Sequence, residues 1–239
     1  ERLKPVRAEK FSMHQFVDLV KNKPWVSMTL MAICTNFFNG FRYAVAGYMF
    51  TYCMGGDITI GRLIINYTVF MAFGEVTCMI FGGLSPVVAK WLGSKRGAFM
   101  FSGIVCFVTS LIFFFIPMDP KYIWVMIGVS ILTSAGIGIY SPLVWSMYAD
   151  VADYATKKNG TSSTGLIFSS GTMAQKFGTA MFLGLAGAHM INDQFGNPII
   201  DPASITDSVL QMVWALFSLF PAALALLLIL LSYLYPIKK

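Results

Sequence analysis

The chain has 239 residues, of which 56% are hydrophobic and only 12% are charged, and its formal net charge is +6. Soluble globular proteins are nearer one quarter charged, so this composition indicates an integral membrane protein. The basic residues lie at the ends of apolar segments and form no basic face with interleaved aromatic residues, which argues against a nucleic-acid partner. The cysteines also lie within or beside apolar segments without paired spacing, so we expect neither a metal site nor a cofactor.

Residues 1–24 are expected to form a cytoplasmic linker that ends in a short amphipathic helix. Met13, Phe16, Val17 and Val20 follow the helical spacing of one apolar face, which is typical of a helix on the membrane surface. The chain opens without an initiator methionine, and we interpret it as a polypeptide trimmed at its front.

Six apolar runs of about 20 residues or more predict membrane-spanning helices. The expected fold is therefore an all-α membrane protein in which residues 25–235 form a six-helix bundle and residues 236–239 form a cytoplasmic tail. The predicted spans are residues 25–54, 62–91, 97–116, 121–149, 165–190 and 207–235.

The charge of the connecting segments alternates from one side to the other. Thirteen lysine and arginine residues lie on the side that holds both ends of the chain, and two lie on the opposite side. Basic residues are concentrated on the cytoplasmic side of membrane proteins. We therefore expect both ends of this segment in the cytoplasm and a location in a bacterial inner membrane.

Lys176 is the only charged residue of the fifth predicted span and lies near its centre. A charge at that depth costs roughly 2.5–3.5 kcal/mol on insertion scales unless it faces protein or water. Thr172, Gln175 and Thr179 share its helix face at spacings of three and four residues. This face is the predicted wall of a polar cavity.

Two further ionisable residues, Glu75 and Arg42, lie within predicted spans. Glu75 lies at a depth similar to that of Lys176, which favours pairing between the two. The alternative is a buried ion pair that only fixes helix packing. Arg42 has two open interpretations, in which it either extends to the outer interface or lines the cavity.

Polar residues are unevenly distributed over the six spans. The first, second, fourth and fifth spans carry polar stripes, whereas the third and sixth are predominantly apolar, which gives a period of three helices. Gly136, Gly138 and Pro142 are expected to interrupt the fourth span, as in transporter helices that bend around a site. The period favours a three-plus-three inverted repeat, as in one half of a major facilitator fold.

Neutral polar groups beside aromatic rings suit a sugar, because hydroxyl groups need donors and acceptors and a sugar face stacks on a ring. Asn39, Tyr43 and Trp145 are the candidate sugar contacts besides the polar face of Lys176. Lysine and arginine would add hydrogen bonds to hydroxyl groups, or a countercharge for a uronate.

Two segments carry a family likeness: YADVADY at 148–154 and GLIFSSGTMAQKFGTA at 165–180. Together with LVKNKPW at 19–25 and LGSKRGAF at 92–99, they resemble the glycoside–pentoside–hexuronide:cation symporters, the family of the sodium/melibiose permease. The likeness implies sugar uptake by alternating access, driven by sodium, lithium or protons. Members have twelve helices, so the chain is similar to the carboxy-terminal half, and the amino-terminal six-helix half is an expected partner.

The resemblance also assigns roles to residues. The family's lysine and threonine of the sugar and cation region fall on Lys176 and Thr172. Its aspartate pair falls on Asp150 and Asp153, which by likeness close the cytoplasmic side with Lys95 or Arg96 as partner. The family's main cation-binding aspartates belong to the amino-terminal half, so the coupling ion, sodium or proton, is expected to bind mainly there.

The chain departs from the family pattern after the aspartate pair. Ser162, Ser163 and Thr164 stand where the family carries charged residues, so we expect a thinner network of cytoplasmic ion pairs.

Two other functions are alternatives to a sugar transporter. A self-contained six-helix carrier or channel for another small polar solute remains the alternative. An intramembrane enzyme is disfavoured, because the sequence has no HExxH motif and no pair of carboxylates at membrane depth.

Overall fold

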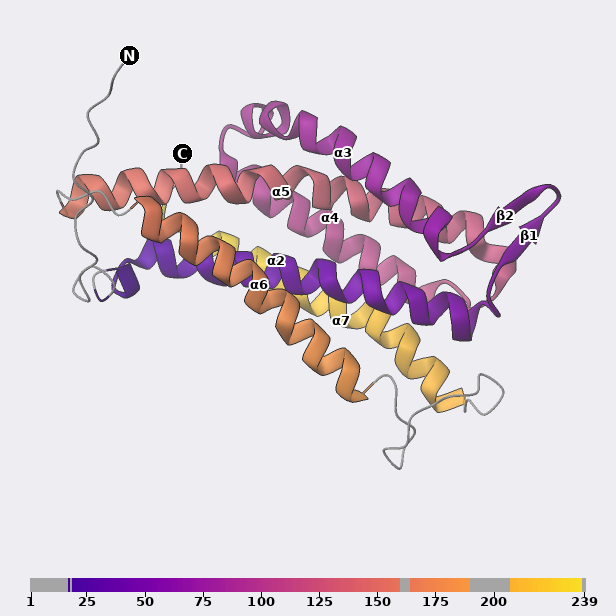
Figure 1. Ribbon diagram of the computed structural model, residues 1–239. Coiled ribbons are helices and arrows are strands. Elements are labelled where there is room, and N and C mark those ends of the chain that lie inside the picture. Colours follow the sequence, from indigo (N-terminus) through magenta and orange to yellow (C-terminus); the bar gives the residue numbers. More distant parts are fainter. Residues whose placement is uncertain (1–16, 18, 160–163, 190–206, 238–239) are drawn as a thin grey trace, which may run out of the picture.

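The structure is a computed structural model that describes residues 17, 19–159, 164–189 and 207–237. Within them, long helices dominate (Figure 1). These are α2 (Lys23–Tyr48), α3 (Tyr67–Trp91), α4 (Lys95–Phe115), α5 (Ile123–Asn159), α6 (Thr164–His189) and α7 (Asp207–Leu234). The short elements are the π-helical turn η1 (Met49–Cys53), strands β1 (Ile58–Ile60) and β2 (Leu63–Ile65), and the 3-10 turn η2 (Pro120–Tyr122).

Each predicted span corresponds to one of the long helices. Four of the helices, α3, α4, α5 and α7, are long and apolar enough to cross a membrane by length and composition. The other two, α2 and α6, are each 26 residues long and carry the polar residues singled out in the sequence. The described part of the chain is therefore an all-α membrane protein with one small hairpin.

That hairpin corrects the prediction that the second span begins at residue 62. β1 and β2 pair antiparallel with Ile58 opposite Ile65, and Gly61 enters their two-residue turn with a φ of 63°. Glycine adopts positive φ without steric cost. α3 begins only at Tyr67, where the Asn66 side chain accepts a hydrogen bond from the Val69 amide at 3.0 Å. The apolar residues of β2 are continuous with the apolar run of α3, which is why the sequence places the beginning of the span too early.

α5 also differs from its prediction. It continues to Asn159, ten residues beyond the predicted end at 149, because no glycine or proline follows until Gly160. The expected interruption at Gly136 and Gly138 was wrong, since α5 runs unbroken through both. A Cβ at Gly138 would lie 2.5 Å from the Cys78 carbonyl oxygen, and one at Gly136 would lie 2.9 Å from the Cys106 sulfur. These glycines therefore allow α3 and α4 to pack closely on α5.

Most of the apolar part of α5 is buried by its neighbours. α3 packs mainly on α5, α4 lies between α5 and α7, and α2 lies between α7 and α6. α4 exposes an entirely apolar stripe of Phe101, Ile104, Val108 and Ile112, as expected for a lipid-facing helix. α3 was expected to be polar, but its exposed side chains are mostly apolar, with Glu75 as the charged exception near its middle.

Most of the predicted surface helix, including Met13 and Phe16, lies outside the described residues, as do Ser162 and Ser163. In the described portion, Leu19 is buried against the bundle, whereas Val17 and Val20 are exposed. α2 begins one residue before Pro24, which occupies the first helical turn as expected.

Candidate substrate and coupling site

The polar face predicted for the fifth span lies on α6. Thr172, Lys176 and Thr179 are exposed, and Gln175 is partly buried. Lys176 is the thirteenth residue of the 26-residue helix, about 18 Å from its start at 1.5 Å per residue. Ser169, Thr172, Met173 and Lys176 line an open hollow of about 430 Å³. This ammonium group therefore borders a void and is not sealed among hydrocarbon side chains.

The opposite face of α6 is built from small residues that pack on α2. Ala174 is buried, and a Cβ on Gly178 would lie 2.5 Å from the Ile33 carbonyl oxygen. Ala174 and Gly178 lie four residues apart, a spacing of small residues that allows helices to pack closely, whereas Ala180 is exposed. The indole of Trp25 on α2 also donates to the Ser170 hydroxyl at 2.7 Å. α6 is therefore held against α2 with its polar face outward.

The two threonine hydroxyls of this face donate within their own helix. Thr172 donates to the Phe168 carbonyl at 3.2 Å, and Thr179 donates to the Gln175 carbonyl at 3.1 Å. Each hydroxyl oxygen keeps acceptor capacity for a ligand donor. Lys176 supplies donors only, so the face offers both kinds of hydrogen-bonding group.

An aromatic pair connects α5 to α6. The Trp145 ring on α5 lies parallel to the Phe168 ring on α6, with centroids 6.2 Å apart and an interplanar angle of 4°. Trp145 is 39% exposed, so part of the indole stays accessible. Phe168 directly precedes Ser169 of the hollow. Phe168 is not among the site residues predicted from the sequence, because a single aromatic residue does not stand out in an apolar span.

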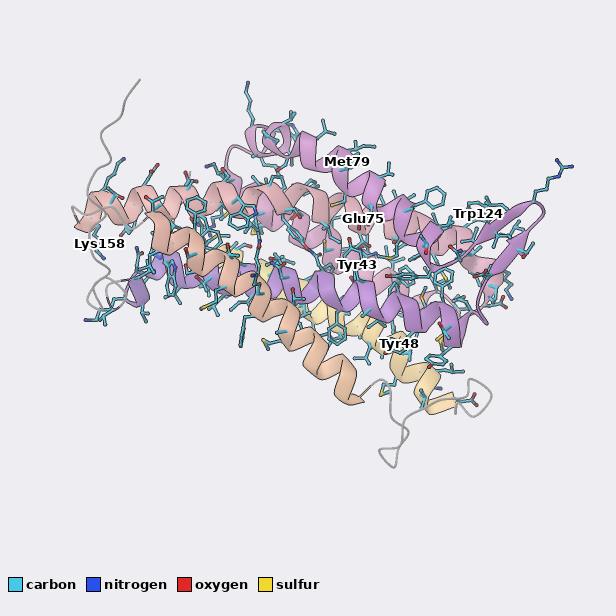
Figure 2. All side chains as sticks on the ribbon, in the orientation of Figure 1. Tyr43, Tyr48, Glu75, Met79, Trp124 and Lys158 are labelled. Carbon is cyan, nitrogen blue, oxygen red and sulfur yellow. The ribbon has the colours of Figure 1, made fainter. Side chains whose placement is uncertain are left out.

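The candidate residues of α2 contact α3 and α5 and are not among the residues that line the hollow beside Lys176. The Tyr43 hydroxyl donates to the Glu75 carboxylate of α3, and the two side chains point toward one another in Figure 2. Asn39 accepts a hydrogen bond from the Tyr140 hydroxyl of α5 at 2.7 Å. Glu75 and Lys176 form no ion pair in the described residues, so the expected pairing was wrong.

Arg42 follows neither of its two predicted alternatives. It is 7% exposed, and its guanidinium donates to the Ser130 hydroxyl of α5 at 2.9 Å. The guanidinium therefore lies inside the bundle rather than at an interface or a cavity wall. Three hydrogen-bonded pairs thus join neighbouring residues of α2 to α3 and α5, and they are referred to below as the α2–α3–α5 cluster: Arg42 with Ser130, Tyr43 with Glu75, and Asn39 with Tyr140.

At the end of the bundle where α5 terminates, Lys95 and Asp150 form an ion pair with a nitrogen–oxygen distance of 2.6 Å. Both side chains are partly buried, and the Lys95 ammonium also lies 3.5 Å from the Ser146 carbonyl oxygen. Arg96 does not join this ion pair. Its guanidinium donates a hydrogen bond to the Tyr233 carbonyl and lies 5.6 Å from the centroid of the Tyr233 ring. Asp153 is exposed and makes no ion pair within the described part of the chain.

A family profile described as MFS/sugar transport protein matches residues 4–239. The chain belongs to this family. It is a family of transporters, which supports a transport role rather than an enzymatic one.

Curated relatives match at low identity. A candidate sulfoquinovose importer of Escherichia coli (strain K12) is 23% identical over 216 residues, which is 90% of this chain and 43% of the relative. Its counterpart in Salmonella typhimurium (strain LT2) is 22% identical over 90% of this chain and 42% of the relative. An uncharacterized 29.9 kDa protein of Pseudescherichia vulneris is 27% identical over 56% of this chain and 47% of its own length. The chain spans less than half the length of the curated relatives it matches.

Proposed function

We propose that this chain is the carboxy-terminal half of a cation-coupled sugar symporter that works by alternating access in a bacterial inner membrane. The observation that carries the proposal is the outward polar face of α6, on which Lys176 lies beside an open hollow at mid-helix while glycine seals the opposite face against α2. A transporter needs a solvated polar wall of this kind where it faces its other half. The family match and the relatives named for import of sulfoquinovose support a sugar as the solute.

The sugar would lie against α6 and the part of α5 around Trp145. Lys176 and Gln175 would donate hydrogen bonds to its hydroxyl groups, and Thr172 and Thr179 would accept them. The accessible part of Trp145, held parallel to Phe168, would stack on the apolar face of the ring. Asn39 and Tyr43, proposed from the sequence as contacts, would act beside it from the α2–α3–α5 cluster.

We also propose that Glu75 and Arg42 serve coupling. Glu75 is exposed on α3 and accepts a hydrogen bond from Tyr43, whereas Arg42 is buried beside Ser130. Glu75 would exchange the coupling cation, and Arg42 would hold the neighbouring contact between α2 and α5 through Ser130. The main cation site is proposed in the amino-terminal half, with this cluster as a second element of coupling.

The ion pair of Lys95 with Asp150 is proposed as part of a cytoplasmic gate. It joins the beginning of α4 to the cytoplasmic extension of α5. Asp153 and Arg96 flank it, and Asp153 is free to engage a group from the other half.

Uptake by the full-length protein tests the role of Lys176. Loss of one charge-assisted hydrogen bond is worth about 1.5–3 kcal/mol, so Lys176→Ala should weaken sugar affinity by roughly ten- to a hundred-fold at normal expression. Lys121→Ala, which removes an exposed lysine that pairs with Asp119 at the opposite end of α5, is the matched control. A panel of glycosides and acidic sugars, with and without sodium, would identify the solute. Unchanged uptake by Lys176→Ala would refute the site.

Glu75→Gln tests the coupling proposal separately. If Glu75 carries a coupled proton, the variant should still equilibrate sugar across the membrane but should lose accumulation against a gradient. Accumulation equal to that of the unmodified protein would remove Glu75 from the mechanism and leave coupling to the other half.

A further inference from the structure

A cluster of lysines at one end of the bundle takes no part in the proposed sugar site. Lys21 and Lys23 lie where α2 begins, and Lys158 lies in the last turn of α5, where Figure 2 labels it. Together with Tyr154 of α5 they line a hollow of about 310 Å³, referred to below as the basic hollow. No carboxylate is among its described lining residues.

A second hollow of about 260 Å³ adjoins the basic hollow. The two share Lys21, Lys23 and Pro236, and the second adds apolar side chains from α2 and α7. Val20 is 48% exposed and Leu234 is 68% exposed. The two hollows therefore combine the ammonium groups of the lysines with the exposed apolar side chains of Val20 and Leu234.

The beginning of α2 adds a further positive element. The first backbone N–H groups of a helix are unpaired within it and carry a partial positive charge. Asn22, at the N-cap position, makes no side-chain hydrogen bond to them. An anion in the basic hollow would thus meet three ammonium groups close to an uncapped helix start.

We propose that these two hollows bind an anionic glycerophospholipid of the cytoplasmic leaflet. Its phosphate and head group would occupy the basic hollow, and one acyl chain would lie along Val20 and Leu234. The location supports this ligand, because the site lies where α2 begins and α7 ends, at the edge of the membrane-spanning bundle. Basic pockets between helices on the cytoplasmic side are suited to anionic lipid head groups. The orientation used here rests on the proposed cytoplasmic location of both ends.

A soluble phosphate compound would satisfy the lysines but would leave the adjoining apolar surface uncovered. An acyl chain would cover Val20 and Leu234, which are exposed beside the lysines. This exposed apolar surface therefore favours a lipid over a free anion.

Lipid retention by the full-length protein tests the proposal. The purified protein is titrated with phosphatidylglycerol or with phosphatidylcholine of the same chain length, and bound lipid is counted by native mass spectrometry. Lys23→Gln with Lys158→Gln should weaken phosphatidylglycerol binding by roughly five-fold per lysine. The matched control is Lys90→Gln with Lys157→Gln, which removes the same charge from exposed residues that do not line either hollow. The control should stay within two-fold of the unmodified protein.

An equal loss in both double variants would overturn the proposal in favour of diffuse attraction to the surface, as would the absence of any preference for phosphatidylglycerol. Glycerol phosphate supplies a further test: displacement of the lipid at equal concentration would show that the site recognises a soluble anion only. The double variant Lys23→Arg with Lys158→Arg keeps both charges and should bind phosphatidylglycerol as the unmodified protein does. This result would exclude misfolding as the cause of a loss in the glutamine variant. Because binding is measured without transport, this result and the test of sugar uptake are independent.

Discussion

Gly178 provides a direct test of how α6 is positioned. The Cβ of an alanine at this position would lie 2.5 Å from the Ile33 carbonyl oxygen, whereas ordinary contacts lie at 3.4–4 Å. The other near atoms are the Asn36 Cβ and the Phe37 amide nitrogen, each at 3.2 Å. Three of α2's residues therefore face the added methyl group, two of them with backbone atoms. Backbone cannot rotate away as a side chain can, so α6 must move outward.

Overpacking of this kind typically destabilises a protein by about 1–3 kcal/mol. The higher helix propensity of alanine offsets up to about 1 kcal/mol of this destabilisation. We therefore expect Gly178→Ala to destabilise the full-length protein by about 1–2 kcal/mol. The shift in melting temperature per kcal/mol falls as chain length rises, and the full-length protein is proposed to be about twice as long as this chain. We therefore expect a decrease of about 1–4 °C, measured by thermal unfolding in detergent.

Gly83→Ala is the matched control. Gly83 lies in α3, and a Cβ there would have no neighbour within 4 Å. The same substitution should leave the melting temperature unchanged or raise it slightly. If Gly178→Ala melted at or above the temperature of the unmodified protein, the close packing of α6 on α2 would be refuted.

Two further predictions concern polar contacts between helices. Asp150→Asn should increase labelling of a cysteine introduced beside the proposed cytoplasmic gate, because it removes the charge pair with Lys95. Exchange of the two residues should restore protection, and unaltered labelling would contradict a gate. Tyr140→Phe should lower the free energy of unfolding by about 0.5–1.5 kcal/mol, since it removes the hydrogen bond to Asn39. That change should vanish in an Asn39→Ala background, and an additive loss in the double variant would show that the bond contributes nothing.

The long helices were predictable because each spans an apolar run bounded by polar residues. α4, for example, begins just after Ser94, whose side chain accepts from the Gly97 amide, and ends before Pro117. The β-hairpin was not predictable from the sequence. Ile58, Ile60 and the residues of β2 are as apolar as the residues at the end of a membrane-spanning helix. Only Gly61 and the cap at Asn66 distinguish the two, and both act through local backbone geometry.

The helix face of Lys176 was predictable from spacing alone, since residues three and four apart share a face. The residues that these side chains contact on other helices were not predictable. Arg42 contacts Ser130, which is 88 residues away, and no periodicity states which helix faces which. The stacking of Trp145 on Phe168 was missed for the same reason, because it depends on how α5 meets α6.

α6 is joined to α2 at two separate heights. The Trp25 indole reaches Ser170 near the beginning of both helices, and Gly178 rests on Ile33 further along. Two points of attachment, separated along α2, restrict sliding and pivoting of α6 against it. Lys21 and Lys23 stand where α2 begins, and Lys176 lies between the two attachment points on α6. A displacement of the beginning of α2 should therefore also displace Lys176, the residue proposed to face the solute.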